Sequence, residues 1–147
     1  MRIAELAARH PRIGLDSNLF IYIFEGSALA GVLRPVFQLI EDGAIQAVLA
    51  SLGLTEVLAG PARARDAAVF EGYAAELHSI PNLRVVPLDV ETAIDAGWMR
   101  SESMSIGDAV HLATARRAGA TAFLTNDGRL RSRPGLEVIR IADLVEA

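Results

Sequence analysis

Short apolar segments alternate with segments of helical periodicity along almost the whole chain. The apolar segments have the length of buried strands and lie near residues 12–15, 45–50, 83–87, 121–124 and 137–141. A helix that connects two such strands joins them in parallel. We therefore expect an α/β fold, a three-layer α/β/α sandwich around a parallel sheet of four or five strands.

The connecting segments have the periodicity and end signals of helices. Apolar residues recur three or four positions apart, and Gly, Pro or a capping side chain marks the ends. The expected helices cover about residues 1–9, 17–24, 31–41, 51–60, 63–77, 89–100 and 105–118, with a short one after residue 141. With 147 residues and no repeat or linker, the chain is expected to be one domain, 1–147, in which residues 1–11 form an N-terminal extension.

Composition narrows the cellular context. The chain has no cysteine, which excludes disulfides and zinc–thiolate sites. Although 52% of the residues are hydrophobic, no uninterrupted apolar run reaches the ~18 residues that a membrane span needs. The N-terminus lacks the apolar segment of a signal peptide. We therefore expect a cytoplasmic protein that does not interact with a membrane.

Charge is distributed unevenly along the chain. The net charge of −4 argues against general coating of nucleic acid. Residues 116–140, however, carry six arginines against two acids, whereas the rest of the chain carries eight arginines against sixteen acids. Such a basic segment either contacts a phosphate backbone or is simply a solvated surface. The candidate RNA contacts are Arg116, Arg117, Arg129, Arg131 and Arg133.

Four acidic residues stand at boundaries between the expected strands and helices. Asp16 and Asp127 directly follow strands, Glu56 lies about one helical turn beyond a strand, and Asp108 lies in the first turn of a helix. In a parallel sheet such positions meet at the carboxyl edge, where α/β folds bind ligands. Carboxylates gathered there repel one another unless a cation lies between them. Because oxygen ligands select hard cations, the pattern predicts a Mg²⁺ or Mn²⁺ site for phosphodiester hydrolysis.

Each acid also has a purely structural interpretation. Asp16 can cap the helix that follows it, and Glu56 can be a polar residue on a solvated helix face. Asp108 is the fourth residue of a possible capping box that starts at Ser105. The segment Asn126-Asp127-Gly128 is a common turn sequence. The conjunction of all four acids at one expected edge favours the metal site over these separate interpretations.

Three further side chains have two interpretations each. His111 follows Asp108 by three residues, so it shares a helix face with that acid and can reach a metal or a phosphate. Alternatively, it packs as a partly buried histidine. Tyr22 and Trp98 can stack on bases, although the helical spacing of Trp98 is more typical of a core or an interface.

From about Arg12 onward the chain resembles PIN-domain proteins, and most of all the VapC-type ribonuclease toxins of toxin–antitoxin pairs. The matching motifs, in family order and approximate spacing, are Leu15-Asp16-Ser17-Asn18, Ser51 through Thr55-Glu56, Asp108-Ala109-Val110-His111-Leu112-Ala113-Thr114-Ala115 and Leu124-Thr125-Asn126-Asp127. The resemblance implies a PIN-like fold in which the four acids bind one or two Mg²⁺ or Mn²⁺ ions. It also implies that water activated by the metal cleaves RNA.

The resemblance has further implications for site residues and partners. Asn18 and Thr125 would orient carboxylates or water around the metal. A homodimer is implied, together with a small antitoxin that places a segment, and an arginine, among the carboxylates. The chain departs from the family pattern in the extension 1–11, because family members usually start almost directly at the first strand. Members also vary in activity.

Two other classes of function remain open from the sequence. One is a phosphatase or phosphotransferase with Asp16 as the nucleophile. Such enzymes often carry a second acid two residues later, where this chain has Asn18. The other is a non-catalytic PIN-like binding module whose acids bind a metal only weakly.

Overall fold

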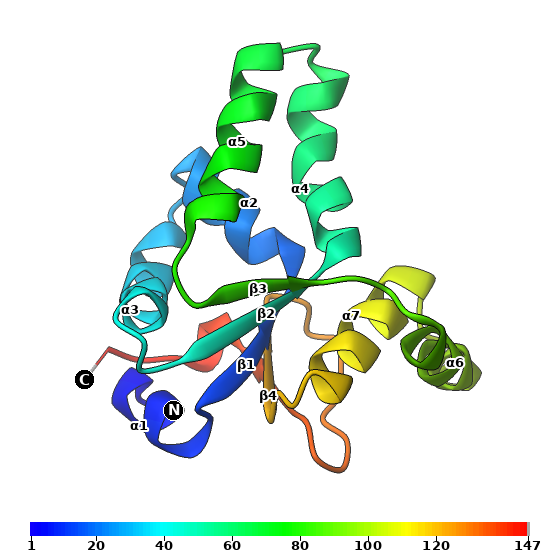
Figure 1. Cartoon of the computed structure of the whole chain (residues 1–147). Helices are drawn as coiled ribbons and strands as arrows, with labels where there is room; N and C mark the ends of the chain where they lie inside the picture. Colours follow the sequence, from blue (N-terminus) through cyan, green and yellow to red (C-terminus); the bar gives the residue numbers. More distant parts are fainter. Residues whose placement is uncertain (147) are drawn as a thin grey trace.

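The computed structural model describes residues 1–146, which form a five-stranded, fully parallel sheet with helices on both faces (Figure 1). The strands are β1 (Arg12–Leu15), β2 (Gln46–Ala50), β3 (Leu83–Val86), β4 (Ala122–Thr125) and β5 (Glu137–Arg140). Their order in the sheet is β3-β2-β1-β4-β5. The expected α/β fold with a parallel sheet of four or five strands is therefore confirmed.

Helices connect the strands at most of the expected places. They are α1 (Ile3–Arg9), α2 (Ser17–Glu25), α3 (Ala30–Glu41), α4 (Ser51–Arg63), α5 (Ala67–Ser79), α6 (Val90–Met99) and α7 (Ile106–Arg117), with 3₁₀ turns η1 (Arg100–Glu102) and η2 (Ile141–Asp143). The Asp89 and Ser105 side chains cap α6 and α7 by accepting hydrogen bonds from backbone N–H groups, as the sequence predicted. The short helix expected after residue 141 is the single turn η2.

The boundary between α4 and α5 differs from the prediction. Helix α4 was expected to end at Gly60-Pro61, but it continues to Arg63 with Pro61 inside it. Proline is tolerated there because it removes only one hydrogen bond in the last turns, and the N–H of Ala64 still donates to the carbonyl of Gly60. Helix α5 then starts at Ala67 rather than at 63, because the Asp66 side chain caps it. The two helices form a hairpin that projects from the sheet (Figure 1).

Alternate residues of the strands face two separate cores. Ile13 and Leu15 of β1 and Leu124 of β4 belong to the core that also contains residues of α1, α2 and α3. Phe123 of β4 belongs to the core on the opposite face, which α6 and α7 cover. This is the period-2 alternation of a sheet buried on both faces.

The N-terminal extension packs against the rest of the chain. Ile3 and Leu6 of α1 are buried in the core. The N–H of Ile3 donates to the carbonyl of Val145 at 2.9 Å, which ties α1 to the C-terminal segment. His10, at the end of α1, is also buried and contacts Thr121 Oγ1 and Glu137 Oε2, each at 2.9 Å. The extension is thus a packing helix.

The strand order reverses at the carboxyl ends of β1 and β4, and we call this edge of the sheet the crevice. From β1 the chain continues outward through β2 and β3 on one side, whereas β4 and β5 lie on the other side. Ligands of open α/β sheets bind where the order reverses in this way. Asp16 follows β1 and Asp127 follows β4 after one residue, so both stand at this crevice.

Among residues 1–146, no single helix is long and apolar enough to cross a membrane. Helices α2 and α3 pass that test of length and composition only as a pair, and they are bent by 112° relative to each other.

Close packing of α7 on β1 requires a glycine at position 14. A Cβ atom there would lie 2.5 Å from Ala115 Cβ and 2.9 Å from Phe123 Cδ2. We expect Gly14→Ala to destabilise the fold by ~1–3 kcal/mol through overpacking, measured by urea unfolding.

Gly72→Ala is the matched control, because its Cβ would meet no atom within 4 Å. In the interior of α5 this change should stabilise the chain by ~0.5–1 kcal/mol. Equal stability of the two variants would contradict the packing argument.

Candidate metal centre

Asp16 is a buried carboxylate at the end of the central strand. The hydrogen-bond ladder between β1 and β4 extends to this residue, since its N–H donates to the carbonyl of Leu124 at 3.0 Å. This register places Asp16 beside Thr125, whose hydroxyl donates to Asp16 Oδ2 at 2.7 Å. Asp16 occupies the N-cap position of α2, but its side chain accepts no capping hydrogen bond. The side chain is therefore oriented by β4 rather than by the helix that it precedes.

Burial is the main effect that disfavours the ionised form of Asp16. Burial raises the pKa of its carboxyl above the usual value, and the hydrogen bond from Thr125 opposes that rise. Among the nearby charges, His111 lowers the pKa, whereas the negative charges of Glu56 and Asp108 raise it. Glu56 and Asp108 thus each lie within electrostatic reach of Asp16.

Glu56, on the first half of α4, is paired with His111 of α7. The His111 Nε2 atom lies 2.5 Å from Glu56 Oε1, and this hydrogen bond is the main reason that the pKa of Glu56 is lowered. The carboxylate therefore accepts and Nε2 carries the proton. His111 itself is only 3% exposed, and its Nδ1 has no hydrogen-bond partner within residues 1–146. His111 is thus a buried side chain that holds Glu56.

The His111 ring occupies space beside α4 that is free because residue 53 is a glycine. A Cβ atom on Gly53 would lie 3.3 Å from His111 Cε1 and in steric conflict with the Leu49 side chain. The sequence indicated His111 only through its position three residues after Asp108. Its partner is 55 residues away, so no local pattern could reveal the pair.

Asp108 lies in the first turn of α7, as the sequence predicted. Its backbone N–H donates to Ser105 Oγ at 3.1 Å, so Ser105 is the cap of this helix. The Asp108 carboxylate does not make that contact. Its negative charge acts on Asp16 and on Arg129, whose pKa it helps to raise.

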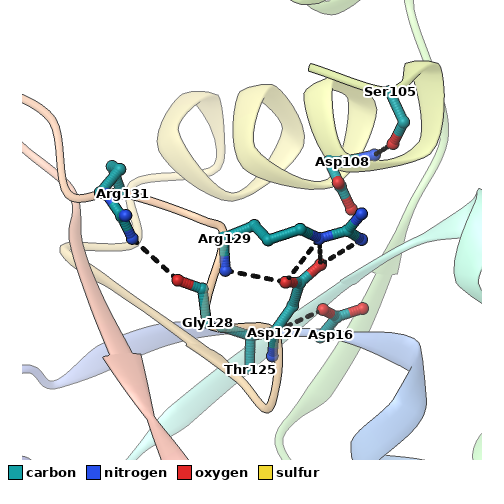
Figure 2. A network of polar contacts seen from close by, with 8 residues as sticks. All are labelled: Asp16, Ser105, Asp108, Thr125, Asp127, Gly128, Arg129 and Arg131. Atoms are coloured by element: carbon teal, nitrogen blue, oxygen red, sulfur yellow. Dashed lines mark hydrogen bonds and ion pairs between the residues drawn. The ribbon is translucent and has the colours of Figure 1, made fainter. Parts of the chain in front are cut away.

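Asp127 is held by the arginine that follows it two residues later (Figure 2). The Arg129 guanidinium donates to both carboxylate oxygens, from Nε to Oδ1 at 3.0 Å and from Nη2 to Oδ2 at 2.8 Å. The backbone N–H of Arg129 also donates to Oδ1. These contacts lower the pKa of Asp127. Figure 2 shows the guanidinium between Asp127 and Asp108.

Thr125 connects the Asp16 carboxylate, after β1, with the backbone of Asp127, after β4. Its hydroxyl donates to Asp16 and accepts the backbone N–H of Asp127 at 2.9 Å. Thr125 is fully buried. Asn18 makes no such contact, because its Oδ1 is buried without a hydrogen-bond partner within the described chain.

The acids converge on one crevice without forming a closed chelate. In residues 1–146, no three Asp, Glu, His or Cys side chains are close enough together to hold a metal ion. Asp16, Glu56 and Asp108 interact electrostatically, while Arg129 holds Asp127. The set of acids still fits Mg²⁺ or Mn²⁺, because its ligand atoms are all oxygens and the ionised form of Asp16 is disfavoured by burial and, to a smaller extent, by Glu56 and Asp108. The Asn18 side-chain oxygen, two residues after Asp16, is buried without a hydrogen-bond partner in the described chain.

The predicted arginines are divided between two places. Arg116 and Arg117 lie at the end of α7 remote from Asp108, and Arg117 pairs with Asp95 of α6 at 3.1 Å. Arg129 and Arg131 lie in the loop after β4, where Arg129 contacts Asp127 and Arg131 contacts the carbonyl of Gly128 (Figure 2). Of the predicted set, these two and Arg133 line the pocket next to the acids.

The two aromatic candidates also differ in setting. Trp98 is 81% exposed on α6, so the core interpretation of this residue is wrong. Tyr22 is half-buried on α2, and its hydroxyl accepts a hydrogen bond from Asn126 Nδ2 at 3.0 Å. Tyr22 therefore supports the turn that carries Asp127.

Removal of the Asp16 charge should stabilise the fold. The pKa of Asp16 is higher in the folded than in the unfolded chain, so its ionised form opposes folding. Asp16→Asn keeps an acceptor for Thr125 and should raise stability at pH 7 by on the order of 1 kcal/mol. Because the penalty vanishes when both states are protonated, the gain should shrink as the pH falls toward about 4.

Thermal unfolding in EDTA, followed by circular dichroism over this pH range, measures the difference between Asp16→Asn and the parent chain. Glu71→Gln, on the exposed side of α5, is the control and should leave the melting temperature unchanged. A lower melting temperature for Asp16→Asn at pH 7 would show that the carboxylate stabilises the fold instead.

Solved structures with the same fold contain VapBC proteins. One is VapBC2 from Rickettsia felis, bound to a DNA fragment from its promoter. Its sequence is 14% identical to this chain, the alignment covers 88% of this chain and 98% of that chain, and the TM-score is 0.67. DNA-bound VapBC from Salmonella typhimurium is 22% identical, with coverages of 88% and 98% and a TM-score of 0.66. VapC20 from Mycobacterium tuberculosis, a sarcin–ricin loop cleaving toxin, is 19% identical, with coverages of 79% and 90% and a TM-score of 0.64.

At the level of sequence, no curated protein matches the chain. The family model described as PIN domain does match it, over residues 13–136. This range includes all four acids of the crevice and the strands of the sheet except Arg12 of β1 and the whole of β5. The chain therefore belongs to the PIN-domain family.

Proposed function

We propose that this chain is a divalent-metal-dependent endoribonuclease and the toxin of a toxin–antitoxin pair. The observation that carries the proposal is the buried Asp16 carboxylate, which Thr125 orients at the end of β1 and which lies within electrostatic reach of Glu56 and Asp108. A cation bound there would remove the repulsion among these carboxylates. Membership of the PIN-domain family supports the reaction class, as does the likeness to a toxin that cleaves the sarcin–ricin loop.

The side chains have separate tasks in this reaction. Bound Mg²⁺ or Mn²⁺ would supply a water of lowered pKa and positive charge for the phosphorane. Asp16, Glu56 and Asp108 would hold the ion, and Asp127 would join them after release from Arg129. Thr125 keeps Asp16 oriented, and His111 keeps Glu56 oriented, each through one hydrogen bond.

The bond changes in the proposed reaction require no covalent intermediate on the protein. The oxygen of water bonds to phosphorus while one phosphorus–oxygen ester bond of the RNA strand breaks. The departing oxygen gains a proton, so that a phosphate monoester and a hydroxyl end remain. The crevice is open to solvent at Asp127 and Arg129, which gives a strand access to the acids.

A partner protein is the second part of the proposal. The solved relatives include VapBC proteins and a toxin–antitoxin complex from Klebsiella pneumoniae. In this chain, the Arg129 guanidinium already binds a crevice carboxylate. An antitoxin arginine would bind in the same manner and so block the acids. We also propose that the chain forms a homodimer and acts in the cytoplasm, where its RNA substrate is found.

A non-catalytic binding module is the alternative that one observation favours. Arg129 neutralises Asp127, and no three ligating side chains in residues 1–146 are close enough together to hold an ion. A domain with this geometry in solution would bind a metal weakly and leave RNA intact.

RNA cleavage separates these functions. The purified chain should cleave total RNA at discrete sites with Mg²⁺ or Mn²⁺, and EDTA should stop the reaction. Asp16→Asn should lower the rate by about 100-fold or more, because the metal site contributes several kcal/mol of transition-state stabilisation. Primer extension across the cut sites measures the rate. Glu71→Gln is the control and should cleave like the parent chain.

The other possible results of this experiment lead to other conclusions. Intact RNA with every divalent metal tested, from a folded chain, would leave the binding module. A trapped acyl-phosphate on Asp16 would instead indicate the phosphatase. Cleavage that persists in EDTA or in the Asp16→Asn variant would point to a contaminating nuclease.

The partner is tested by co-expression with the protein of the neighbouring reading frame. We expect the two proteins to co-purify, and we expect the chain alone to arrest growth and to migrate as a dimer in size-exclusion chromatography with light scattering. Asp16→Asn should abolish growth arrest and retain the complex. A non-toxic monomer that does not co-purify with the neighbouring protein would contradict the proposal.

A further inference from the structure

A pocket of about 460 Å³ adjoins the acidic crevice between η1, the start of α7 and the loop after β4. Asp108 and Arg129 line it, and both also border the crevice, so the two sites are continuous. We name it the arginine pocket, because its lining includes Arg100, Arg129, Arg131 and Arg133.

The arginine pocket has an excess of positive charge. Four arginines face two acids, Glu102 and Asp108, in its lining. Arg129 pairs with Asp127, and Arg133 pairs with Glu102 at 3.0 Å. Arg100 and Arg131, by contrast, form no ion pair with any residue of the described chain. Two positive charges in this pocket therefore lack a carboxylate partner.

Backbone carbonyls hold these two unpaired guanidinium groups in place. Arg100 Nη1 donates to the carbonyl of Met104 at 2.7 Å, and Arg131 Nη1 donates to the carbonyl of Gly128 at 2.8 Å. A guanidinium has five N–H donors, so each arginine keeps donors for a ligand. Because their positions are set in advance, less side-chain entropy is lost when an anion binds.

A buried donor in the same pocket points to a ligand as well. The Arg133 side chain is only 9% exposed, yet its Nε has no hydrogen-bond partner within residues 1–146. Burial of such a donor without a partner is costly. The Ser103 and Ser105 hydroxyls also line the pocket. An acceptor with several oxygens would match this set of donors.

We propose that the arginine pocket binds a backbone phosphate of the RNA strand next to the phosphate that is cleaved at the acids. This inference rests on the proposed nuclease function. Phosphate oxygens match guanidinium donors in bidentate fashion. A strand that lies along the crevice passes directly from Asp108 into the pocket, because the two sites share that residue. Contacts to phosphates position a strand without reading its sequence.

RNA binding without cleavage tests the pocket. The probe is a fluorescein-labelled, 2′-O-methyl RNA octamer, and its anisotropy is measured in EDTA with the full chain carrying Asp16→Asn, at several salt concentrations. Arg100→Gln and Arg131→Gln should each weaken binding several-fold and reduce the log–log salt slope by about 0.7. The loss should be the same for two octamers of unrelated sequence. Arg100→Lys should retain the slope.

Arg34→Gln is the matched control, because this exposed arginine lies on α3, which covers the opposite face of the sheet from α7. It should leave both the affinity and the slope unchanged. Circular dichroism melts confirm that each variant is folded. Unchanged binding by folded Arg100→Gln and Arg131→Gln would overturn the proposal. So would variants that bind RNA normally but no longer bind the protein of the neighbouring reading frame, since the pocket would then accept an acidic peptide.

The outcomes for the pocket and for the nuclease are separable. If the parent chain cleaves RNA and the pocket variants bind it unchanged, the nuclease stands and the pocket proposal fails. If the pocket variants lose affinity and salt slope while no metal supports cleavage, the phosphate site stands and the nuclease fails.

Discussion

The geometry of the crevice depends on the two hydrogen bonds of the Thr125 hydroxyl. The hydroxyl donates to the Asp16 carboxylate and accepts the N–H of Asp127, so one buried oxygen connects the residues that follow two neighbouring strands. The parallel register makes this possible, because Leu15 pairs with Leu124 and the next residues therefore meet. A hydroxyl suits the position since it donates and accepts at once. A side chain that could only accept would face the Asp16 oxygen without a proton to share.

Around this connection the fold concentrates negative charge that its own stability does not favour. Asp16 is buried, and Glu56 and Asp108 act on it with like charge. Hydrogen-bond donors of the chain itself offset part of this charge. The buried His111 side chain is hydrogen-bonded to Glu56. The exposed Arg129 side chain forms an ion pair with Asp127. Strain of this kind concentrates at functional sites, where the surrounding structure maintains it.

Much of the fold and the candidate site followed from local patterns in the sequence. The alternation of strands and helices predicted the parallel sheet, and the position of Asp16 and Asp127 after strands predicted their common edge. Other features depend on contacts that no local pattern contains. Pro61 was expected to end α4, yet one missing hydrogen bond near a helix end is too small a loss to do so. Arg100 joins the arginine pocket from η1, outside the basic segment 116–140 that drew attention by its charge. The pairing of Glu56 with His111 likewise requires the tertiary structure.

The absence of a side chain at Gly14 has a consequence for the chemistry at the other end of the same elements. Helix α7 approaches β1 closely only because Ala115 meets no Cβ there, and two turns earlier the same helix carries Asp108. Strand β1 leads from Gly14 to Asp16 in two residues. The close packing of Gly14 against Ala115 in the core thus influences the distance between the Asp16 and Asp108 carboxylates. Volume changes at positions 14 and 115 would alter this distance, without any change in the acids themselves.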